Sequence, residues 1–382
     1  MSVEMKTSRR LSALIKNHAL ALGFDLVGIS PVESRYGEAD LFERWLGRGY
    51  AGEMSYLDRG LLKRKEVERV LPGAKSVVSC AVNYNTENPH STETSGDGWI
   101  SRYAWGDDYH DVMGEMLGEL SEYITGLCPE KSGVKAYVDT GPVLEKVHAS
   151  HSGIGWVGKN TCLINQRAGS WLFLGEVITD IELDYDTAVE DRCGTCTRCI
   201  DACPTDAIVE PYVLDARKCI SYLTIELRGK IPLELREGME NNVFGCDICQ
   251  DICPWNHDAL FTLKESFNPR EKLLSPDFKW LMELDGDGFR EVFRKSPVKR
   301  AKRRGFMRNV LVAVGNSGNK EYIKYVIGFL GDDEPIIRAH AVWALWKLKG
   351  EGCLVELERL LETETDEEVL EEVHYAIDSV RN

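Results

Sequence analysis

The sequence predicts a multidomain protein of the α+β class, in which an α/β unit, a cysteine-rich unit and a helical unit follow one another. The chain has 382 residues, which is enough for two or three domains. Eight of its twelve cysteines fall within residues 193–253, and from about residue 300 the apolar pattern becomes helical and repetitive. We therefore expect the units at residues 1–185, 186–258 and 259–382.

Bulk composition narrows the class of protein. The chain is 43% hydrophobic and 28% charged, as ordinary globular proteins are. Its net charge of −16 excludes a general attraction to nucleic acid, so any such binding needs a local basic patch. No apolar run approaches the roughly 18 residues of a membrane helix. The clustering of the cysteines favours a metal centre over a disulfide scaffold.

The N-terminal stretch TSRRLSALIK (7–16) resembles a twin-arginine export signal. Such a signal needs about 7–15 uninterrupted apolar residues after the arginines. Lys16, Asn17 and His18 interrupt that run. We therefore expect a structural amphipathic helix and a cytoplasmic protein. The helical spacing is carried by Leu11, Leu14, Ile15, His18 and Leu22.

The first unit alternates predicted strands with predicted helices. Helical periodicity covers residues 8–22, and YHDVMGEMLGELSEYITGL (109–127) predicts an amphipathic helix. A stretch rich in Ser, Thr, Asn and Gly (85–98) predicts a loop. Apolar stretches predict strands at FDLVGIS (24–30), SVVSCAVNY (76–84), VKAYVDTGP (134–142) and GSWLFLGEVIT (169–179).

The third unit contains an internal repeat. RNVLVAVG (308–315) and RAHAVWAL (338–345) match at a spacing of 30 residues. DEEVLEEVHYAI (366–377) echoes EPIIRAHAVWAL (334–345) at a spacing of 32. These matches predict a short HEAT-like helical repeat, in which each helix pair covers the next. An ordinary helical bundle would explain the same pattern.

The cysteine spacing predicts two [4Fe–4S] clusters. CGTCTRCIDACP (193–204) matches the ferredoxin run C-x2-C-x2-C-x3-C-P, in which the last cysteine ligates the other cluster of two. The second run, VFGCDICQDICP (243–254), has Val243 where its first cysteine is expected. Cys219 is the remaining cysteine inside the unit, and we assign it as the replacement ligand.

This interlocked assignment gives each cluster four thiolates. The first cluster takes Cys193, Cys196, Cys199 and Cys253, and the second takes Cys203, Cys219, Cys246 and Cys249. Zinc also favours CxxC pairs, but it explains neither the two Cys-Pro endings nor the count of eight. We expect buried packing roles for the four cysteines outside the pattern, which are Cys80, Cys128, Cys162 and Cys353.

Three stretches of the first unit resemble those of one enzyme family. They are RYAWGDDYHDVM (102–113), VDTGP (138–142) and GIGWVGKNTCLI (153–164), and the double-cluster unit and helical tail follow them. In this combination the chain resembles epoxyqueuosine reductases over essentially its whole length. The resemblance implies reduction of the epoxide of epoxyqueuosine to the alkene of queuosine, at the wobble position of certain tRNAs.

The resemblance also implies cofactors and site residues. The first unit is then a domain that binds base-off cobalamin, and the two clusters pass it electrons from an external low-potential donor. Asp139 takes the role of proton donor, because opening an epoxide requires a proton that a carboxylic acid with a raised pKa can give. Tyr109 and His110 are implied near the substrate. The implied cofactor contacts are Arg64, Ser101, Arg102, Asp139, Lys159, Asn160, Leu163 and Ser221.

RNA contacts are expected from a local excess of positive charge. RKSPVKRAKRRGFMR (294–308) has eight Lys or Arg and no acid, and phosphate contacts of this kind supply affinity. A solvated helix face is the simpler explanation of such a run. Loop 85–98 and the insert 220–245, with Arg228, Lys230 and Arg236, are candidates to approach the anticodon arm. The acidic tail (351–382) should face away from RNA, and we expect a monomer.

Two other functions compete with the reductase hypothesis. A reductive dehalogenase relative acting on a small molecule would share the cofactors. A non-catalytic iron–sulfur electron carrier would explain residues 186–258 and leave the α/β unit idle. Without the resemblance, Asp139 before Thr140-Gly141-Pro142 also suits a plain turn residue.

Overall fold

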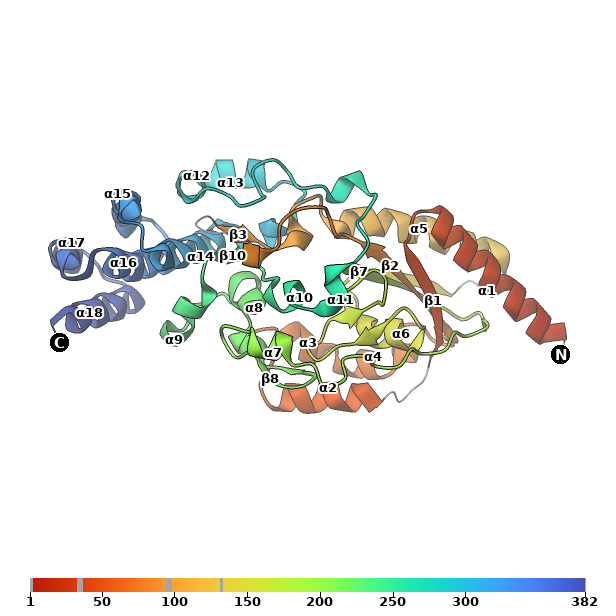
Figure 1. The fold of residues 1–382 in the computed structure, drawn as a ribbon. Coiled ribbons are helices and arrows are strands. Elements are labelled where there is room, and N and C mark those ends of the chain that lie inside the picture. The colour runs from red at the N-terminus through yellow and green to blue at the C-terminus, as the bar shows by residue number, and fades with distance from the viewer. Residues whose placement is uncertain (1–2, 33–36, 94–97, 131–132, 382) are drawn as a thin grey trace.

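The computed structural model describes residues 3–32, 37–93, 98–130 and 133–381. It is elongated, with a β-sheet at the N-terminal end and a group of helices at the C-terminal end (Figure 1). The cysteine-rich segment lies between them. This order follows the order of the three units that the sequence predicts.

The sheet has four strands in the order β1–β2–β7–β4, and every neighbouring pair is antiparallel. The four strands lie where the sequence predicts strands, although the third is much shorter. It ends at Tyr137 because the chain turns at Asp139, whose φ is +57°. The bounds are β1 Leu26–Pro31, β2 Ser76–Asn83, β4 Val134–Tyr137 and β7 Leu172–Thr179.

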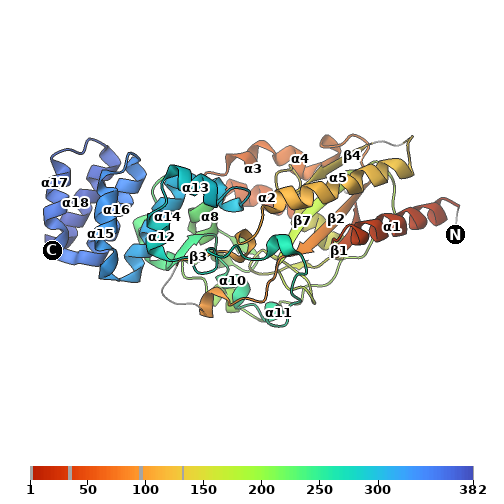
Figure 2. The same cartoon turned by 90° about the horizontal axis from the view of Figure 1, so that it is seen from above.

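Helices cover both faces of the sheet. The helices α1 (Val3–Ala21) and α5 (Tyr109–Leu127) pack on one face, as both views show (Figures 1 and 2). The short helix α6 (Glu145–His151) packs on the other face. All eight residues of β2 are buried because both of its faces are covered. The predicted structural helix near the N-terminus is confirmed, since Ile15 on α1 is fully buried.

The sequence analysis assigned no element between the first two strands. The structure has three helices there, α2 (Gly37–Gly47), α3 (Ser55–Arg59) and α4 (Leu61–Lys65). Two small strand pairs complete the first half of the chain. β5 (Trp156–Val157) pairs with β6 (Leu163–Ile164), and β3 (Trp99–Ile100) pairs in parallel with β10 (Asn242–Phe244) of the cysteine-rich segment.

The cysteine-rich segment consists of short helices and one small hairpin. Its last strand, β10, joins it to the first unit through β3. The elements are α7 Arg198–Asp201, β8 Ile208–Glu210, β9 Val213–Leu214, α8 Ile220–Ile225, α9 Leu233–Arg236, α10 Ile248–Asp251 and α11 Pro254–His257.

Three long helices form the inner layer of the C-terminal end. They are α14 (Lys302–Ser317), α16 (Pro335–Lys349) and α18 (Glu367–Arg381), and α14 packs on α16, which packs on α18. The three repeated sequence stretches lie on these helices. The shorter helices of this end are α12 Phe278–Met282, α13 Gly286–Val292, α15 Ile323–Gly328 and α17 Leu354–Leu361. No helix in the described part of the chain combines the length and apolar character needed to cross a membrane.

Buried polar side chains of the inner helices hold the insert 220–245. The guanidinium of Arg308 donates to the carbonyl oxygens of Leu227 and Gly229, at 2.9 and 2.7 Å. Arg236 in the insert forms a buried ion pair with Glu372 on α18, at 2.5 Å. Both arginines are therefore structural. The expectation that Arg236 faces RNA is wrong, and Arg308 is likewise unavailable to phosphates.

Candidate active site

A cavity of about 320 Å³ lies where the Asp139 turn meets the cysteine-rich segment. One wall is aromatic, and the ring of Tyr109 stacks on that of Phe173 with 4.4 Å between centroids. Polar groups line the remainder, so the cavity can hold a large ligand with an apolar face and a polar rim. The lining side chains include Tyr84, Tyr103, Asp139, Glu145, Lys146, Cys162, Leu163 and Gln250.

Asp139 is held at the cavity by three contacts. The hydroxyl of Tyr109 donates to its Oδ2 atom at 3.1 Å, and Nε2 of His110 lies 3.6 Å from the same atom. Its main-chain N–H donates to Oε1 of Glu145 at 2.6 Å. The carboxyl remains 65% exposed, so a ligand in the cavity can reach it.

His110 connects Asp139 to the basic stretch 294–308. Its Nδ1 atom lies 2.8 Å from Oδ1 of Asp108, whose Oδ2 accepts from Nζ of Lys299 at 2.8 Å. Although burial lowers the pKa of His110, its hydrogen bonds to Asp108 and Asp139 raise it to about 9. The imidazole is therefore protonated at neutral pH.

This pairing contradicts one expectation about the acid. The protonated His110 ring 3.6 Å away lowers the pKa of Asp139, whereas a raised pKa was expected from a dry pocket. Asp139 is thus a carboxylate in the ligand-free protein, and the proton of the pair resides on His110. Tyr109 and His110, implied near the substrate by resemblance, are the two side chains that contact the Asp139 carboxyl.

Two further carboxyl groups lie beside Asp139, and the sequence analysis missed both. Burial and the negative charge of Asp139 raise the pKa of Glu145 to about 7. Burial and the charge of Glu145 raise the pKa of Glu176 well above its usual range. A sequence clue existed, because Glu176 interrupts the otherwise apolar strand LFLGEVIT.

Besides Asp139, two more of the predicted cofactor contacts lie at or beside the cavity. Leu163 lines it. Arg64 lies close enough to Asp139 and Glu145 that their charges oppose the lowering of its pKa by burial. Its guanidinium also reaches the carbonyl oxygens of Tyr56 and Leu57, both at 3.4 Å.

The other predicted contacts brace the cysteine loops. Lys159 donates through Nζ to the carbonyl oxygens of Gly194 and Cys196, at 2.7 and 2.9 Å. Nδ2 of the neighbouring Asn160 reaches the carbonyl oxygen of Cys249 at 3.3 Å. Ser101 and Arg102, both buried, bind the carboxylate of Asp247 in the second cysteine run. None of these four residues lines the cavity, so their side chains are structural in the ligand-free protein.

Six of the predicted ligand cysteines fall into two sets of electrostatic neighbours. Burial raises the pKa of Cys246, and the neighbouring thiols of Cys219 and Cys203 raise it further. Burial likewise raises the pKa of Cys253, and the neighbouring thiols of Cys193 and Cys199 raise it further. These neighbours fall into the two interlocked sets that the sequence predicts, with Cys219 beside Cys203 and Cys246. Within the described ranges, no three His, Cys, Asp or Glu side chains gather tightly enough to hold a single metal ion.

The second set of thiols borders the cavity. Cys162, which lines the cavity, hydrogen-bonds with Cys249. The main-chain N–H and hydroxyl of Ser221 are directed at the thiol of Cys219. The expected packing role holds for the buried Cys80 and Cys353, whereas Cys162 faces the cavity and Cys128 is partly exposed.

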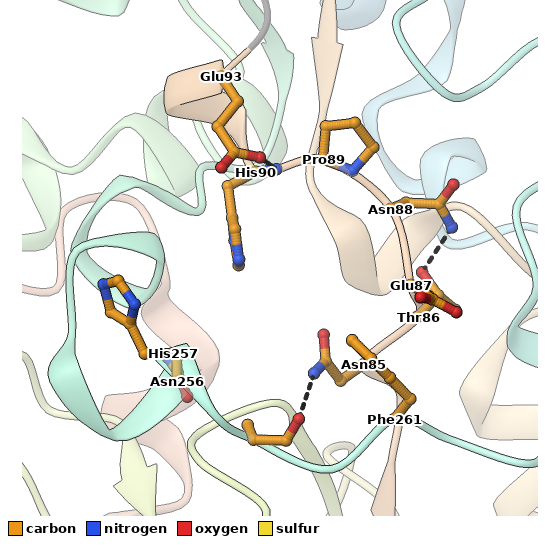
Figure 3. Close-up of a pocket in the computed structure, with 11 residues that line it drawn as sticks. Asn85, Thr86, Glu87, Asn88, Pro89, His90, Glu93, Asn256, His257 and Phe261 are labelled. Carbon is orange, nitrogen blue, oxygen red and sulfur yellow. Dashed lines mark hydrogen bonds between the residues drawn. The ribbon is translucent and has the colours of Figure 1, made fainter.

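A second hollow, of about 290 Å³, lies between loop residues 85–93 and the segment 256–261 (Figure 3). Figure 3 shows His90 and His257 on its rim. The guanidinium of Arg102 holds this loop by donating to the carbonyl oxygens of Asn88 and Pro89 at 3.0 and 3.1 Å. The hollow shares no lining residue with the Asp139 cavity. Residues 94–97 of the predicted loop lie outside the described part of the chain.

Two family models match the chain. The model described as Epoxyqueuosine reductase QueG, DUF1730 matches residues 64–140. The model described as 4Fe-4S double cluster binding domain matches residues 192–256. The second match confirms an iron–sulfur double-cluster segment, and the zinc alternative is wrong.

Two similar proteins are both named epoxyqueuosine reductase. An epoxyqueuosine reductase of Cellulophaga algicola is 45% identical over 306 residues, which cover 80% of this chain and 99% of the relative. That of Escherichia coli (strain K12) is 39% identical over 354 residues, which cover 91% of this chain and 93% of the relative.

Solved structures agree with these relatives. The fold matches a crystal structure of epoxyqueuosine reductase with an epoxyqueuosine-modified tRNA-Tyr stem loop at a TM-score of 0.89 and 32% identity, over 98% of this chain and 99% of that one. It matches the Bacillus subtilis enzyme, solved with its aspartate-bearing catalytic loop swung out of the active site, at a TM-score of 0.88 and 31% identity, over 97% and 99%. The chain matches these relatives over nearly their full length, and its cavity is lined by Asp139 and by a residue of the double-cluster segment. The chain therefore belongs to the epoxyqueuosine reductase family.

Proposed function

We propose that this oxidoreductase reduces the epoxide of epoxyqueuosine in tRNA to the alkene of queuosine at the cavity that Asp139 lines. The observation that carries this proposal is the cavity itself, which brings a paired carboxylate within reach of the second group of cysteines. The reaction delivers both electrons and protons to one substrate. Asp139 at the cavity would supply protons, and the neighbouring cysteine segment would supply electrons. The relatives named above support the substrate class.

In this proposal Asp139 gives the proton and His110 holds it beforehand. The imidazolium lies 3.6 Å from Oδ2 of Asp139, and Asp108 keeps the ring oriented. As the C–O bond breaks, the epoxide oxygen becomes basic and takes the one proton of the pair, which His110 passes to it through the Asp139 carboxylate. Tyr109 keeps the carboxyl pointed into the cavity. The catalytic aspartate loop of the Bacillus subtilis relative supports this role.

The residues present also fit the cofactors that the family resemblance implies. The two groups of thiols suit two [4Fe–4S] clusters, held by Cys193, Cys196, Cys199 and Cys253 and by Cys203, Cys219, Cys246 and Cys249. The aromatic wall and polar rim of the cavity suit one face of base-off cobalamin, which Leu163, Arg64 and Ser221 would help to hold. Bound there, cobalamin would pass reducing electrons to the epoxide carbon. Its domain would be residues 1–185, and 186–258 would carry the clusters.

The tRNA would lie along the basic stretch at the mouth of the cavity. Lys299 and Arg300 are more than half exposed, although each also pairs with an acid of the protein. Arg300 is close enough that its charge lowers the pKa of Asp139, after the larger effect of His110. Phosphates bound here would bring the anticodon loop to the acid. The stacked helices of residues 259–382 would act as a HEAT-like platform for the RNA.

The cellular setting follows from the substrate. We place the protein in the cytoplasm, as a monomer with one face open to tRNA, and we expect an external low-potential electron donor. The test is to load the protein anaerobically with iron, sulfide and cobalamin, reduce it, and add a stem loop carrying epoxyqueuosine. Queuosine should form only with both cofactors and reductant. Its absence from a fully loaded, reduced protein would refute the proposal.

A further inference from the structure

Glu176 is a buried acid whose carboxyl oxygens receive no hydrogen bond in the described part of the chain. It lies in the middle of β7, paired with Ser79 of β2 on one side and Tyr137 of β4 on the other. The residue is completely buried, and neither carboxyl oxygen has a hydrogen-bond partner among the described residues. An ionised carboxylate in such a place is costly, so the group is held in its protonated form. It therefore stores a proton in the centre of the sheet.

Glu145 stands between this buried acid and the cavity. It begins α6, lines the cavity and accepts the main-chain N–H of Asp139 at 2.6 Å. Its carboxyl is the close neighbour whose charge acts on Glu176. A proton held between the two carboxyls would give Glu176 the hydrogen bond that it otherwise lacks in the described part of the chain.

The surroundings favour retention of that proton at neutral pH. Burial and the charge of Asp139 raise the pKa of Glu145 to about 7, so the pair can both hold and release a proton near neutrality. Lys146 opposes this rise from the same helix. The charged and titratable groups that face the pair are Asp139, Tyr109 of α5, Arg64 of α4, Lys146 of α6 and Cys80 of β2.

The reaction needs two protons, and the Asp139–His110 pair stores one. Conversion of an epoxide to an alkene takes up two electrons, which the reductase reaction already supplies, and two protons. The first C–O bond breaks and its oxygen takes one proton to become a hydroxyl group. The second C–O bond then breaks, the hydroxyl takes another proton and leaves as water, and the C=C bond forms. Asp139 must be protonated again before this second step.

We propose that Glu145, sharing one proton with the buried Glu176, supplies the second proton of the reaction by protonating Asp139 again. This inference rests on the proposed role of Asp139 as the acid. The geometry for it is the contact of Glu145 with the Asp139 main chain at an open cavity, where a water molecule can carry the proton between the carboxyls. Glu145 thus acts on the substrate through Asp139.

The decisive comparison is between Glu145→Gln and Glu145→Ala in the cofactor-loaded enzyme. The glutamine can still accept the Asp139 N–H but cannot carry a proton, whereas alanine loses both. We expect Glu145→Gln and Glu176→Gln each to slow single turnover of the epoxyqueuosine stem loop by about tenfold or more, with unchanged affinity for the stem loop. The decline of the wild-type rate as pH rises through about 7 should disappear. Glu119→Gln, an exposed change on α5, is the control and should leave both unchanged.

A readout independent of turnover is the infrared band of a protonated carboxyl group. The cofactor-free protein should show this band near neutral pH, and Glu176→Gln should lose it. A Glu145→Gln enzyme with the wild-type rate and pH profile, beside a slow Glu145→Ala enzyme, would make Glu145 a brace for the loop and overturn the proposal. If Glu145→Gln does not fold, Glu176→Gln decides by the same criteria. Full activity of Asp139→Asn would instead refute the acid role on which this inference rests.

Discussion

At the scale of single residues, the site depends on how charge is shared around Asp139. A carboxylate beside a protonated imidazole is stable in the ligand-free cavity, because Asp108 holds the other ring nitrogen of His110 at 2.8 Å. The pKa of His110 is raised above its unfolded value of 6.5 to about 9. Its stabilising effect is therefore complete below about pH 6.5 and is lost as pH rises through about 9. The store of the first proton empties over the same range.

Replacement of Asp108 by asparagine should uncouple His110. Asparagine can still cap α5, but it removes the negative charge that holds the imidazolium. We expect the pKa of His110, measured by NMR titration of its ring, to fall from about 9 toward 6.5. Asp277→Asn, which changes a similar cap on the distant helix α12, is the control. An unchanged titration of His110 in the Asp108 variant would contradict the proposed arrangement.

The residues of the site were only partly predictable from the sequence. Asp139 and the cysteines stand in recognisable motifs, so their part in the site could be anticipated. Glu176 left only the clue of an acid in an apolar strand, and Glu145 left none, because the pairing of β7 and the start of α6 bring them beside Asp139. The protonation state of Asp139 was also misjudged, since it depends on the ring of His110, 29 positions earlier in the sequence.

At the scale of elements, the insert 220–245 is held by the C-terminal helices. Arg236 and Glu372 are almost fully buried as an ion pair, and Arg308 satisfies carbonyl groups at the other end of the insert. Cys219 lies just before this insert. The packing of α14 and α18 therefore fixes the segment that follows this proposed cluster ligand, which is why the insert does not loop out freely.

Breaking the Arg236–Glu372 pair should destabilise the protein strongly. Arg236→Ala leaves the Glu372 carboxylate buried without its partner, at a cost of about 3–5 kcal/mol of unfolding free energy. Arg381→Ala, on the same helix as Glu372, removes an exposed pair with Glu358 of α17 and should cost at most about 1 kcal/mol. Denaturant unfolding measures both. Equal losses in the two variants would show that the buried pair has no special role.

Elements with a clear period were predicted well, and short ones were not. The helix 109–127 was found at both ends because Asp108 caps it and four buried residues recur along it. The helices α3, α4 and α6 have five to seven residues, too few to show a period beside Gly and Pro. The inner helices α14 and α16 are buried on most sides, so their repeat was more informative than any amphipathic pattern.

At the scale of the whole molecule, charge is distributed unevenly on an acidic chain. The net charge is −16, yet Lys299, Arg300 and Lys302 are exposed close together in sequence, and Lys299 pairs with Asp108 beside the site. Several cations of the basic stretch are used internally, including Arg303, which pairs with Asp332 at 2.9 Å. Fewer cations of the stretch 294–308 are therefore available for the proposed RNA contact than its sequence suggests.

A single exposed cation should account for about one phosphate contact. Lys302→Ala should weaken binding of the tRNA stem loop and lower the slope of log affinity against log salt concentration by about 0.7–0.9. Lys320→Ala, an equally exposed cation beyond the end of α14, should change neither quantity. Salt-dependent fluorescence titration measures both variants. If the two lysines have the same effect, RNA does not follow the basic stretch.

The proposed account depends most directly on whether Asp139 is the acid. The measurement is single-turnover formation of queuosine from an epoxyqueuosine stem loop by cofactor-loaded, reduced Asp139→Asn beside the wild type. Asparagine keeps the shape of the side chain but cannot give a proton at neutral pH, so the rate should fall by about 10²–10⁴-fold while stem-loop affinity is retained. An Asp139→Asn enzyme that is fully loaded and turns over at the wild-type rate would contradict the account.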